Sequence, residues 1–269
     1  MSTLDVAPGE SLYYEYDAPG AAGATFVFVN ALTGHTATWQ HADIGPRLHQ
    51  AGYGTLTWNF RGQAQTQFAP GTTLSPHLVV EDLRRVVAHV APPRPILVGL
   101  SIGGLFAARG YLTGVPATAL VLVNTLRKSG PRLEWINQAM VAMARTGGTQ
   151  LVMEANLPML VNPEQLQAMR STAFSGKPYQ PMDPADGLFR LMAGSLATDW
   201  DVPYERLALP VLVMTGLHDR VFYMAADVEE LTARIPGVRV VTFPDAGHLI
   251  PVERPRAFAD ALLAFARSL

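Results

Sequence analysis

Short apolar runs alternate with amphipathic segments along most of this chain. The runs expected to be strands are residues 11–19, 24–30, 53–60, 95–100, 117–124, 210–216 and 238–244. The segments expected to be helices are residues 38–50, 76–91, 102–113, 224–235 and 254–269. Several runs are wholly apolar, which is typical of parallel strands buried on both faces. We therefore expect an α/β protein whose mostly parallel sheet is covered by helices on both faces.

The pattern changes between residues 126 and 203. Strand signals are absent there, and the helical segments are interrupted at Gly147 and Gly148, at Pro163 and around residues 176–184. Seven of the ten methionines lie in this stretch. We expect an inserted helical cap at residues 126–203, between two parts of one α/β core at residues 1–125 and 204–269.

Composition removes several classes of function. The 269 residues contain no cysteine, which excludes disulfides, thiolate nucleophiles and cysteine zinc sites. Net charge is −2 without a basic run, so no nucleic-acid partner is expected. No apolar stretch approaches the roughly 18 residues of a membrane span, and the first ten residues do not resemble a secretory signal. A cytoplasmic protein with no membrane partner is the expectation.

One motif carries chemistry directly. Residues 99–103 read GLSIG, a G-x-S-x-G pattern placed between an apolar run and a helix rich in small residues. That context is typical of a nucleophile elbow, which would expose the Ser101 hydroxyl and aim the backbone N–H of Ile102 at the same point. A glycine-rich turn in a non-hydrolytic protein is the alternative interpretation.

A serine hydroxyl needs a base, and the base needs an orienting acid. His248 lies just after the last expected strand, and Asp219 follows the strand at 210–216, 29 residues earlier. Both therefore fall at the carboxyl edge of the sheet, in the chain order serine, acid, histidine. Asp245 is a rival candidate for the acid. It lies only three residues from His248, however, and is therefore better suited to shaping the loop.

The second donor of an oxyanion hole should come from the loop after residues 24–30. The backbone N–H of Leu32 is the best candidate, and Ala31 and Thr33 are alternatives. His35 in the same loop could be a second base, although a hydrogen bond to backbone is the favoured interpretation.

Together, the elbow, the segment at 216–221 and the Gly-His pair at 247–248 resemble the α/β-hydrolase superfamily. The likeness is greatest to small capped enzymes such as enol-lactonases, carboxylesterases, C–C bond hydrolases and haloperoxidase-like esterases. It implies Ser101 as nucleophile, Asp219 as acid, His248 as base, and Leu32 and Ile102 as oxyanion donors. Two segments depart from the common pattern: Asn30-Ala31 replaces His-Gly, and residues 59–64 replace Asp-x-Arg-Gly-His-Gly. Residues 31–34 also resemble, locally, the oxyanion loop of homoserine O-acetyltransferases.

The resemblance implies a serine hydrolase that cleaves a carboxylic ester or lactone of a mainly apolar small molecule, without metal or organic cofactor. An acyltransferase, a C–C bond hydrolase on the same triad and a slow-turnover ligand receptor remain alternatives. Oligomeric state is not readable from the sequence.

Candidate substrate contacts come from the expected cap. They are Trp135, Met140, Met159 and Trp200, with Phe174 and Phe189 as further aromatic walls. Methionine adapts to irregular apolar shapes, but packing of the cap on the core is the favoured interpretation for each residue taken singly. Arg127, Lys128 and Arg132 could bind a substrate carboxylate, although solvated surface positions are the favoured interpretation.

Overall fold

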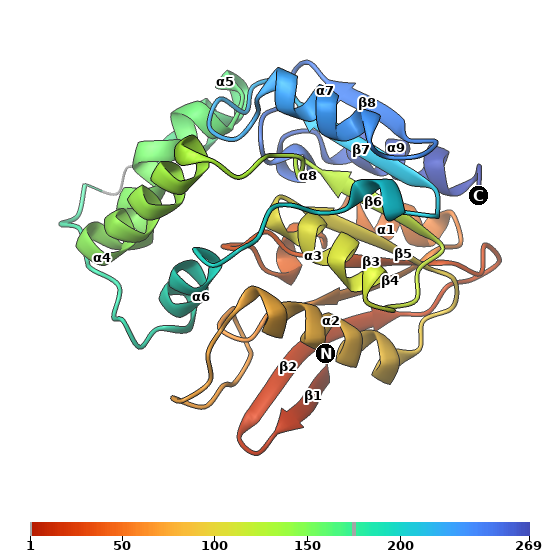
Figure 1. Cartoon of the computed structure of the whole chain (residues 1–269), viewed down its shortest axis with the longest axis horizontal. Helices are drawn as coiled ribbons and strands as arrows, with labels where there is room; N and C mark the ends of the chain where they lie inside the picture. The colour runs from red at the N-terminus through yellow and green to blue at the C-terminus, as the bar shows by residue number, and fades with distance from the viewer. Residues whose placement is uncertain (1, 174–175) are drawn as a thin grey trace.

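A twisted eight-stranded sheet forms the centre of the computed structural model, which describes residues 2–173 and 176–269 (Figure 1). Its strands are β1 (Ser2–Ala7), β2 (Glu10–Asp17), β3 (Thr25–Val29), β4 (Gly54–Trp58), β5 (Pro95–Leu100), β6 (Ala119–Val123), β7 (Val211–Gly216) and β8 (Arg239–Phe243). Their spatial order is β1-β2-β4-β3-β5-β6-β7-β8. Strands β1 and β2 pair antiparallel, β2 is antiparallel to β4, and every other neighbouring pair is parallel. The predicted mostly parallel sheet is confirmed.

Helices cover both faces of the sheet, because side chains alternate along each buried strand. In β5, Leu97 packs with α2 (Pro76–Val90), α3 (Ile102–Leu112) and α7 (Ala225–Ala233). Ile96 and Val98 point the other way, toward α1 (Gly45–Gln50) and α9 (Pro255–Ala266). The helix α2 begins as predicted, since the side chain of Ser75 accepts a hydrogen bond from the backbone N–H of Leu78 at 3.2 Å.

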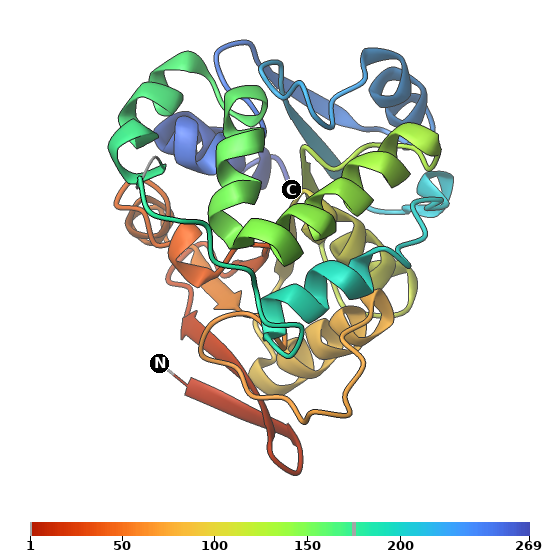
Figure 2. The same cartoon turned by 90° about the vertical axis from the view of Figure 1, so that its left-hand side faces the viewer.

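Strand β1 was not predicted. Its residues are exposed except for Leu4 and Val6, which are half-buried, so its hydrophobic signal is weak. Backbone pairing with β2 decides its conformation, and both strands extend beyond the rest of the sheet (Figure 2). The expected helix at 38–50 is also shorter than predicted: a 3-10 turn at Thr36–Thr38 precedes the six residues of α1.

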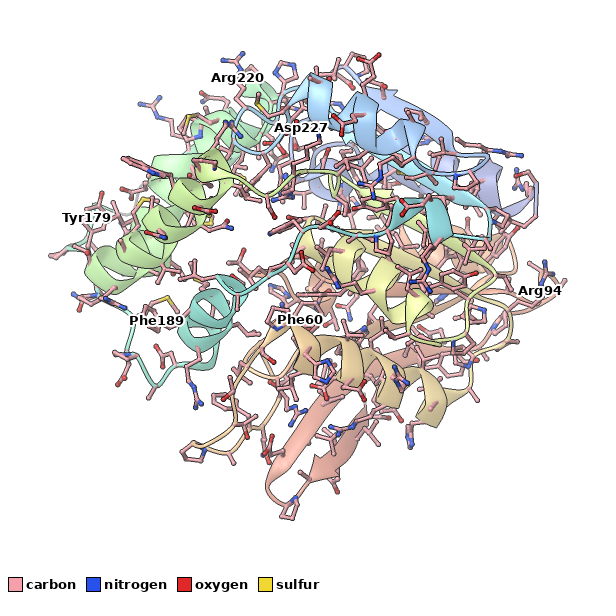
Figure 3. The ribbon with its side chains drawn as sticks, in the orientation of Figure 1. Phe60, Arg94, Tyr179, Phe189, Arg220 and Asp227 are labelled. Atoms are coloured by element: carbon pink, nitrogen blue, oxygen red, sulfur yellow. The ribbon has the colours of Figure 1, made fainter. Side chains whose placement is uncertain are left out.

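Between β6 and β7, the described residues form three α-helices, α4 (Pro131–Leu160), α5 (Pro163–Ala173) and α6 (Gly187–Ser195), followed by a 3-10 helix at Tyr204–Arg206. The three α-helices gather on one side of the molecule, across the ends of the strands (Figures 1 and 2). Helix α4 is kinked at Gly148, whose φ of 70° and ψ of −167° are non-helical. Phe189 on α6 packs with Val141 and Ala144 of α4, so this segment has a small core of its own (Figure 3).

The loop after β4 is tied to the core by a buried arginine. Arg61 donates two hydrogen bonds to Asp82 on α2, at 2.8 and 2.7 Å, and a third to Glu10. All three side chains are buried, and the paired geometry matches the planar guanidinium to a carboxylate. Among the described helices, none combines the length and apolar character needed to cross a membrane.

Candidate active site

Ser101 occupies a sharp turn between β5 and α3. Its backbone φ of 58° and ψ of −125° lie outside the helical and strand regions, and its N–H donates to the carbonyl of Val123 at 2.8 Å. Such a conformation is costly for a residue with a side chain and is concentrated at functional sites. The flanking residue Gly103 cannot carry a side chain, because a Cβ there would clash with the carbonyl oxygens of Val29 and Asn30. The close packing of β5 and α3 holds the hydroxyl at the carboxyl edge of the sheet.

His248 and Asp219 meet beside this turn. Nδ1 of His248 lies 2.6 Å from Oδ2 of Asp219, and both side chains are buried. The other carboxylate oxygen of Asp219 accepts hydrogen bonds from the backbone N–H groups of Val221 at 3.1 Å and Phe222 at 2.9 Å. A proton held on Nδ1 by this carboxylate leaves Nε2 free to act as a base.

The surroundings favour the charged form of Asp219. Burial alone raises its pKa, but the neighbouring His248, the N–H of Phe222 and the charge of Arg127 together lower it below its usual value. Asp245 lies elsewhere: it pairs with Arg254 at 2.6 Å, and this partner lowers its pKa. The structure therefore places Asp219, and not Asp245, against the imidazole.

Two side chains that sequence reasoning missed hold the loop that carries His248. Asn124 donates to the carbonyls of Gly247 at 3.0 Å and His248 at 2.9 Å, and accepts from the N–H of Gly216 at 2.8 Å. The buried carboxylate of Glu253 accepts from the N–H groups on either side of His248, those of Gly247 and Leu249, at 2.8 and 2.9 Å. The loop is thus fastened to β7 and to the turn that follows it.

Three buried amides fasten the loop after β3. Asn30 donates to the side-chain oxygens of Asn59 at 3.0 Å and Gln63 at 2.9 Å. The amide of Gln63 then donates to the carbonyls of Ala31 at 3.0 Å and Leu32 at 3.1 Å. These amides are the same positions at which the sequence departs from the common α/β-hydrolase pattern. The departures therefore form one network that orients the loop.

The expected oxyanion donors lie next to Ser101. Leu32 and Ile102 both line the same cavity as the serine. Within the described part of the chain, the hydrogen bonds include no acceptor for either backbone N–H. His35, by contrast, is exposed, and its ring nitrogen accepts from the N–H of Ala37 at 3.3 Å.

A cavity of about 170 Å³ lies between Ser101 and the inserted helices, and its lining is mainly apolar. Met140 and Trp200 line it, as do Ser101 and His248. Two expected contacts are corrected, since Trp135 and Met159 do not line this cavity. Trp135 is 81% exposed, and Met159 is 44% exposed, its carbonyl accepting from the N–H of Arg220 at 2.7 Å. Phe174 lies outside the described residues.

Arg127 is the unexpected member of the cavity. Sequence reasoning favoured a solvated position, yet the side chain is buried and donates from Nη2 to Oγ of Ser101 at 3.0 Å. Burial lowers its pKa to about 10, and the negative charge of Asp219 opposes this only in part. Lys128 pairs with Glu230, and Arg132 is exposed, so the three basic residues have different environments. Oγ of Ser101 makes no hydrogen bond to His248 among the described residues.

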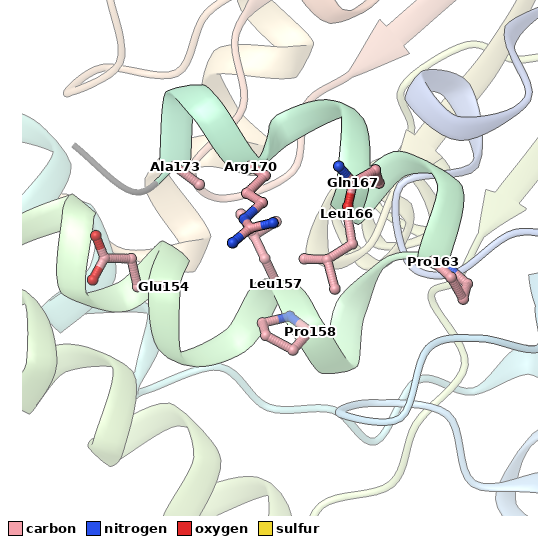
Figure 4. Close-up of a pocket in the computed structure, with 8 residues that line it drawn as sticks. All are labelled: Glu154, Leu157, Pro158, Pro163, Leu166, Gln167, Arg170 and Ala173. Carbon is pink, nitrogen blue, oxygen red and sulfur yellow. The ribbon is translucent and has the colours of Figure 1, made fainter. Parts of the chain in front are cut away.

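A larger hollow, of about 360 Å³, lies between α4 and α5 (Figure 4). Arg170 points from α5 toward α4 there, and Leu157 lines this hollow as well as the cavity at Ser101. Neither Ser101 nor His248 lines it, whereas both line the smaller cavity. In the part of the chain that the structure describes, no three His, Asp or Glu side chains gather as a metal site would require.

Fold and site together define an α/β protein with a serine at a strand–helix elbow and a buried acid–histidine pair beside it. A model of the alpha/beta hydrolase family matches residues 26–261, so the chain belongs to this family, and membership supports hydrolase activity. The chain is 29% identical to the Mycobacterium tuberculosis protein named as non-heme bromoperoxidase BpoC, over 94% of this chain and 97% of that protein.

Two solved structures show the same fold. An esterase from Exiguobacterium antarcticum superposes with a TM-score of 0.81 at 16% identity, covering 99% of each chain. The enol-lactonase from Burkholderia xenovorans LB400 superposes with a TM-score of 0.76 at 23% identity, covering 95% of this chain and 96% of the other. At these identities the likeness concerns the fold.

Proposed function

We propose that this protein is a serine hydrolase that cleaves a carboxylic ester or lactone of a mainly apolar small molecule. The observation that carries the proposal is the 2.6 Å contact between His248 and Asp219 beside a serine held at a strained elbow. The adjoining cavity supports an apolar substrate, since most of the side chains that line it are apolar. Residues 126–203 act as its cap.

Acyl transfer proceeds in two steps at this site. Oγ of Ser101 bonds to the carbonyl carbon while Nε2 of His248 takes its proton, and the leaving oxygen departs with that proton. The N–H groups of Leu32 and Ile102 stabilise the oxyanion, each by about 3–4 kcal/mol. Water then attacks the acyl-enzyme with His248 again as base, and the carboxylic acid leaves. Ser101 must rotate from Arg127 toward His248 for the first step.

Hydrolysis of p-nitrophenyl esters of increasing acyl length tests the proposal. We expect turnover by the wild type, and a loss of at least about a thousandfold in kcat for Ser101→Ala, because the nucleophile is removed. Ser129→Ala, at an exposed position nearby, serves as the matched control. A fluorophosphonate probe should label Ser101 in the wild type, as located by mass spectrometry. Absence of both turnover and labelling would contradict the proposal.

A further inference from the structure

Arg127 brings a fixed positive charge to the nucleophile. Its side chain is 5% exposed, and Nη2 lies 3.0 Å from Oγ of Ser101 and 2.9 Å from the carbonyl of Asn124. The rings of Trp200 and Phe222 lie 4.6 and 4.2 Å from its Cζ. These two rings and one carbonyl hold the guanidinium in place against the cavity wall.

Most of the hydrogen-bonding capacity of this guanidinium is unused. Its Nε is buried without a partner, and Nη1 donates to no acceptor among the described residues. No carboxylate of the described chain lies within ion-pair distance of it. A buried cation without a direct counter-ion, and with three of five N–H groups unpaired, is costly. A bound ligand that supplies the missing acceptor offsets this cost.

We propose that Arg127 binds a carboxylate of the substrate, so that the enzyme prefers anionic esters or lactones to neutral ones. The inference rests on the proposed serine-hydrolase function. A guanidinium matches a carboxylate with two parallel hydrogen bonds. Here Nη1 and Nη2 form the edge beside Ser101, so a carboxylate paired with both takes the place of Oγ of Ser101 on Nη2. Because Nη2 is only 3.0 Å from the nucleophile, the carboxylate lies a few bonds from the carbonyl that Ser101 attacks.

The position of Arg127 also affects the orientation of the Ser101 hydroxyl. In the structure its Nη2 donates to the hydroxyl that must become the nucleophile. A bound carboxylate competes for the same donors, which frees Oγ of Ser101 to turn toward His248. The anionic group thus favours both binding and the attacking orientation.

Two matched pairs of esters test the proposal. Mono-p-nitrophenyl succinate and p-nitrophenyl butyrate differ by a carboxylate in the acyl part, and 4-acetoxybenzoate and phenyl acetate by one in the leaving group. We expect the wild type to prefer the anionic member of one pair by at least about tenfold in kcat/KM. Which pair shows the preference tells whether the substrate carries its carboxylate on the acyl part or on the leaving group. Arg127→Gln, which keeps a polar side chain without the charge, should lose that preference.

Arg132→Gln is the control, because it removes the same charge from an exposed position five residues further along the chain and should keep the preference. If the Arg127 variant does not fold, a second measurement on the wild type still tests the proposal. Succinate should inhibit hydrolysis of the neutral ester competitively, whereas succinamide should not.

Three results would overturn the inference. They are no preference in either pair by the wild type, equal inhibition by succinate and succinamide, and an equal loss on anionic and neutral esters in Arg127→Gln. Turnover of the neutral esters and labelling of Ser101 would persist in the first two cases, so the proposed function would stand. Absence of all turnover and labelling would instead reject the hydrolase itself.

Discussion

At the residue scale, Arg127 places a charge where the fold alone would favour an apolar side chain. Burial lowers its pKa from the ordinary arginine value to about 10, so the folded protein binds this proton less tightly than the unfolded chain does. The buried cation therefore costs stability at every pH below about 10. As the pH rises above about 10, the proton leaves the folded state first, and that cost is progressively relieved.

Arg127→Met should therefore raise the free energy of unfolding at pH 8 by about 1–3 kcal/mol, since similar replacements of buried charges by apolar groups are neutral or stabilising. Urea unfolding of both proteins measures the difference, with Arg132→Met as the exposed control. The advantage of the variant should shrink above pH 10. A variant clearly less stable than the wild type at pH 8 would show that the cation contributes to folding.

At the scale of elements, three amides from two loops position the loop that carries Leu32, whose N–H is the proposed oxyanion donor. Gln63, in the loop after β4, accepts from Asn30 and donates to the carbonyls of Ala31 and Leu32. Replacing it leaves these buried groups without a partner, which costs about 1–3 kcal/mol for a buried polar group. The loop after β3 then loses the orientation on which the N–H of Leu32 depends.

Gln63→Leu should accordingly lower kcat by about ten- to a hundredfold, with a smaller change in KM, because an oxyanion donor acts mainly in the transition state. Ester kinetics and thermal unfolding are the measurements. Gln67→Ala is the matched control, since Gln67 is exposed and pairs with Ser11 through its backbone. A rise in KM with unchanged kcat would assign Gln63 to substrate binding.

At the scale of the whole molecule, the contact between Asp219 and His248 couples the free energy of folding to pH. The folded state lowers the pKa of Asp219, so this carboxylate stabilises the fold above its unfolded pKa of about 3.9. The contribution is lost as the pH falls through the lower value of the folded state. Acid should therefore weaken the wild type more than a variant without this carboxylate.

Asp219→Asn should be less stable than the wild type by about 1–2 kcal/mol at pH 7, the cost of a weakened buried hydrogen bond. Urea unfolding at pH 7, 5 and 3 should show this gap narrowing toward acid. Asp245→Asn is not a neutral comparison, because the pKa of Asp245 is also lowered. Asp227→Asn is the better control, because Asp227 lies on α7 and its side chain makes no hydrogen bond or ion pair among the described residues. A gap that grows toward pH 3 would contradict the assignment.

The spacing of residues along the sequence predicted most strands and helices of this protein. The apolar runs and the amphipathic period located the strands and helices of the core, because each pattern depends on side chains a few residues apart. The elbow at Ser101 and the order of Asp219 and His248 were equally readable, since parallel strands end at one edge of the sheet. Strand β1 was not predicted, because it is held by its pairing with β2 and has little buried surface.

Tertiary structure alone decided which side chains meet. Trp135 and Trp200 belong to the same segment, yet one is 81% exposed and the other 6%. The sequence neighbours of Arg127 suggest a solvated surface position. In the folded protein, its side chain is buried because Trp200, Phe222 and Ser101 pack around it. Burial and hydrogen bonding at these positions are set by partners up to a hundred residues away, which no local pattern encodes. The sequence by itself thus determined most of the elements and the order of the candidate catalytic residues, and the packing of distant segments determined the cavity beside them.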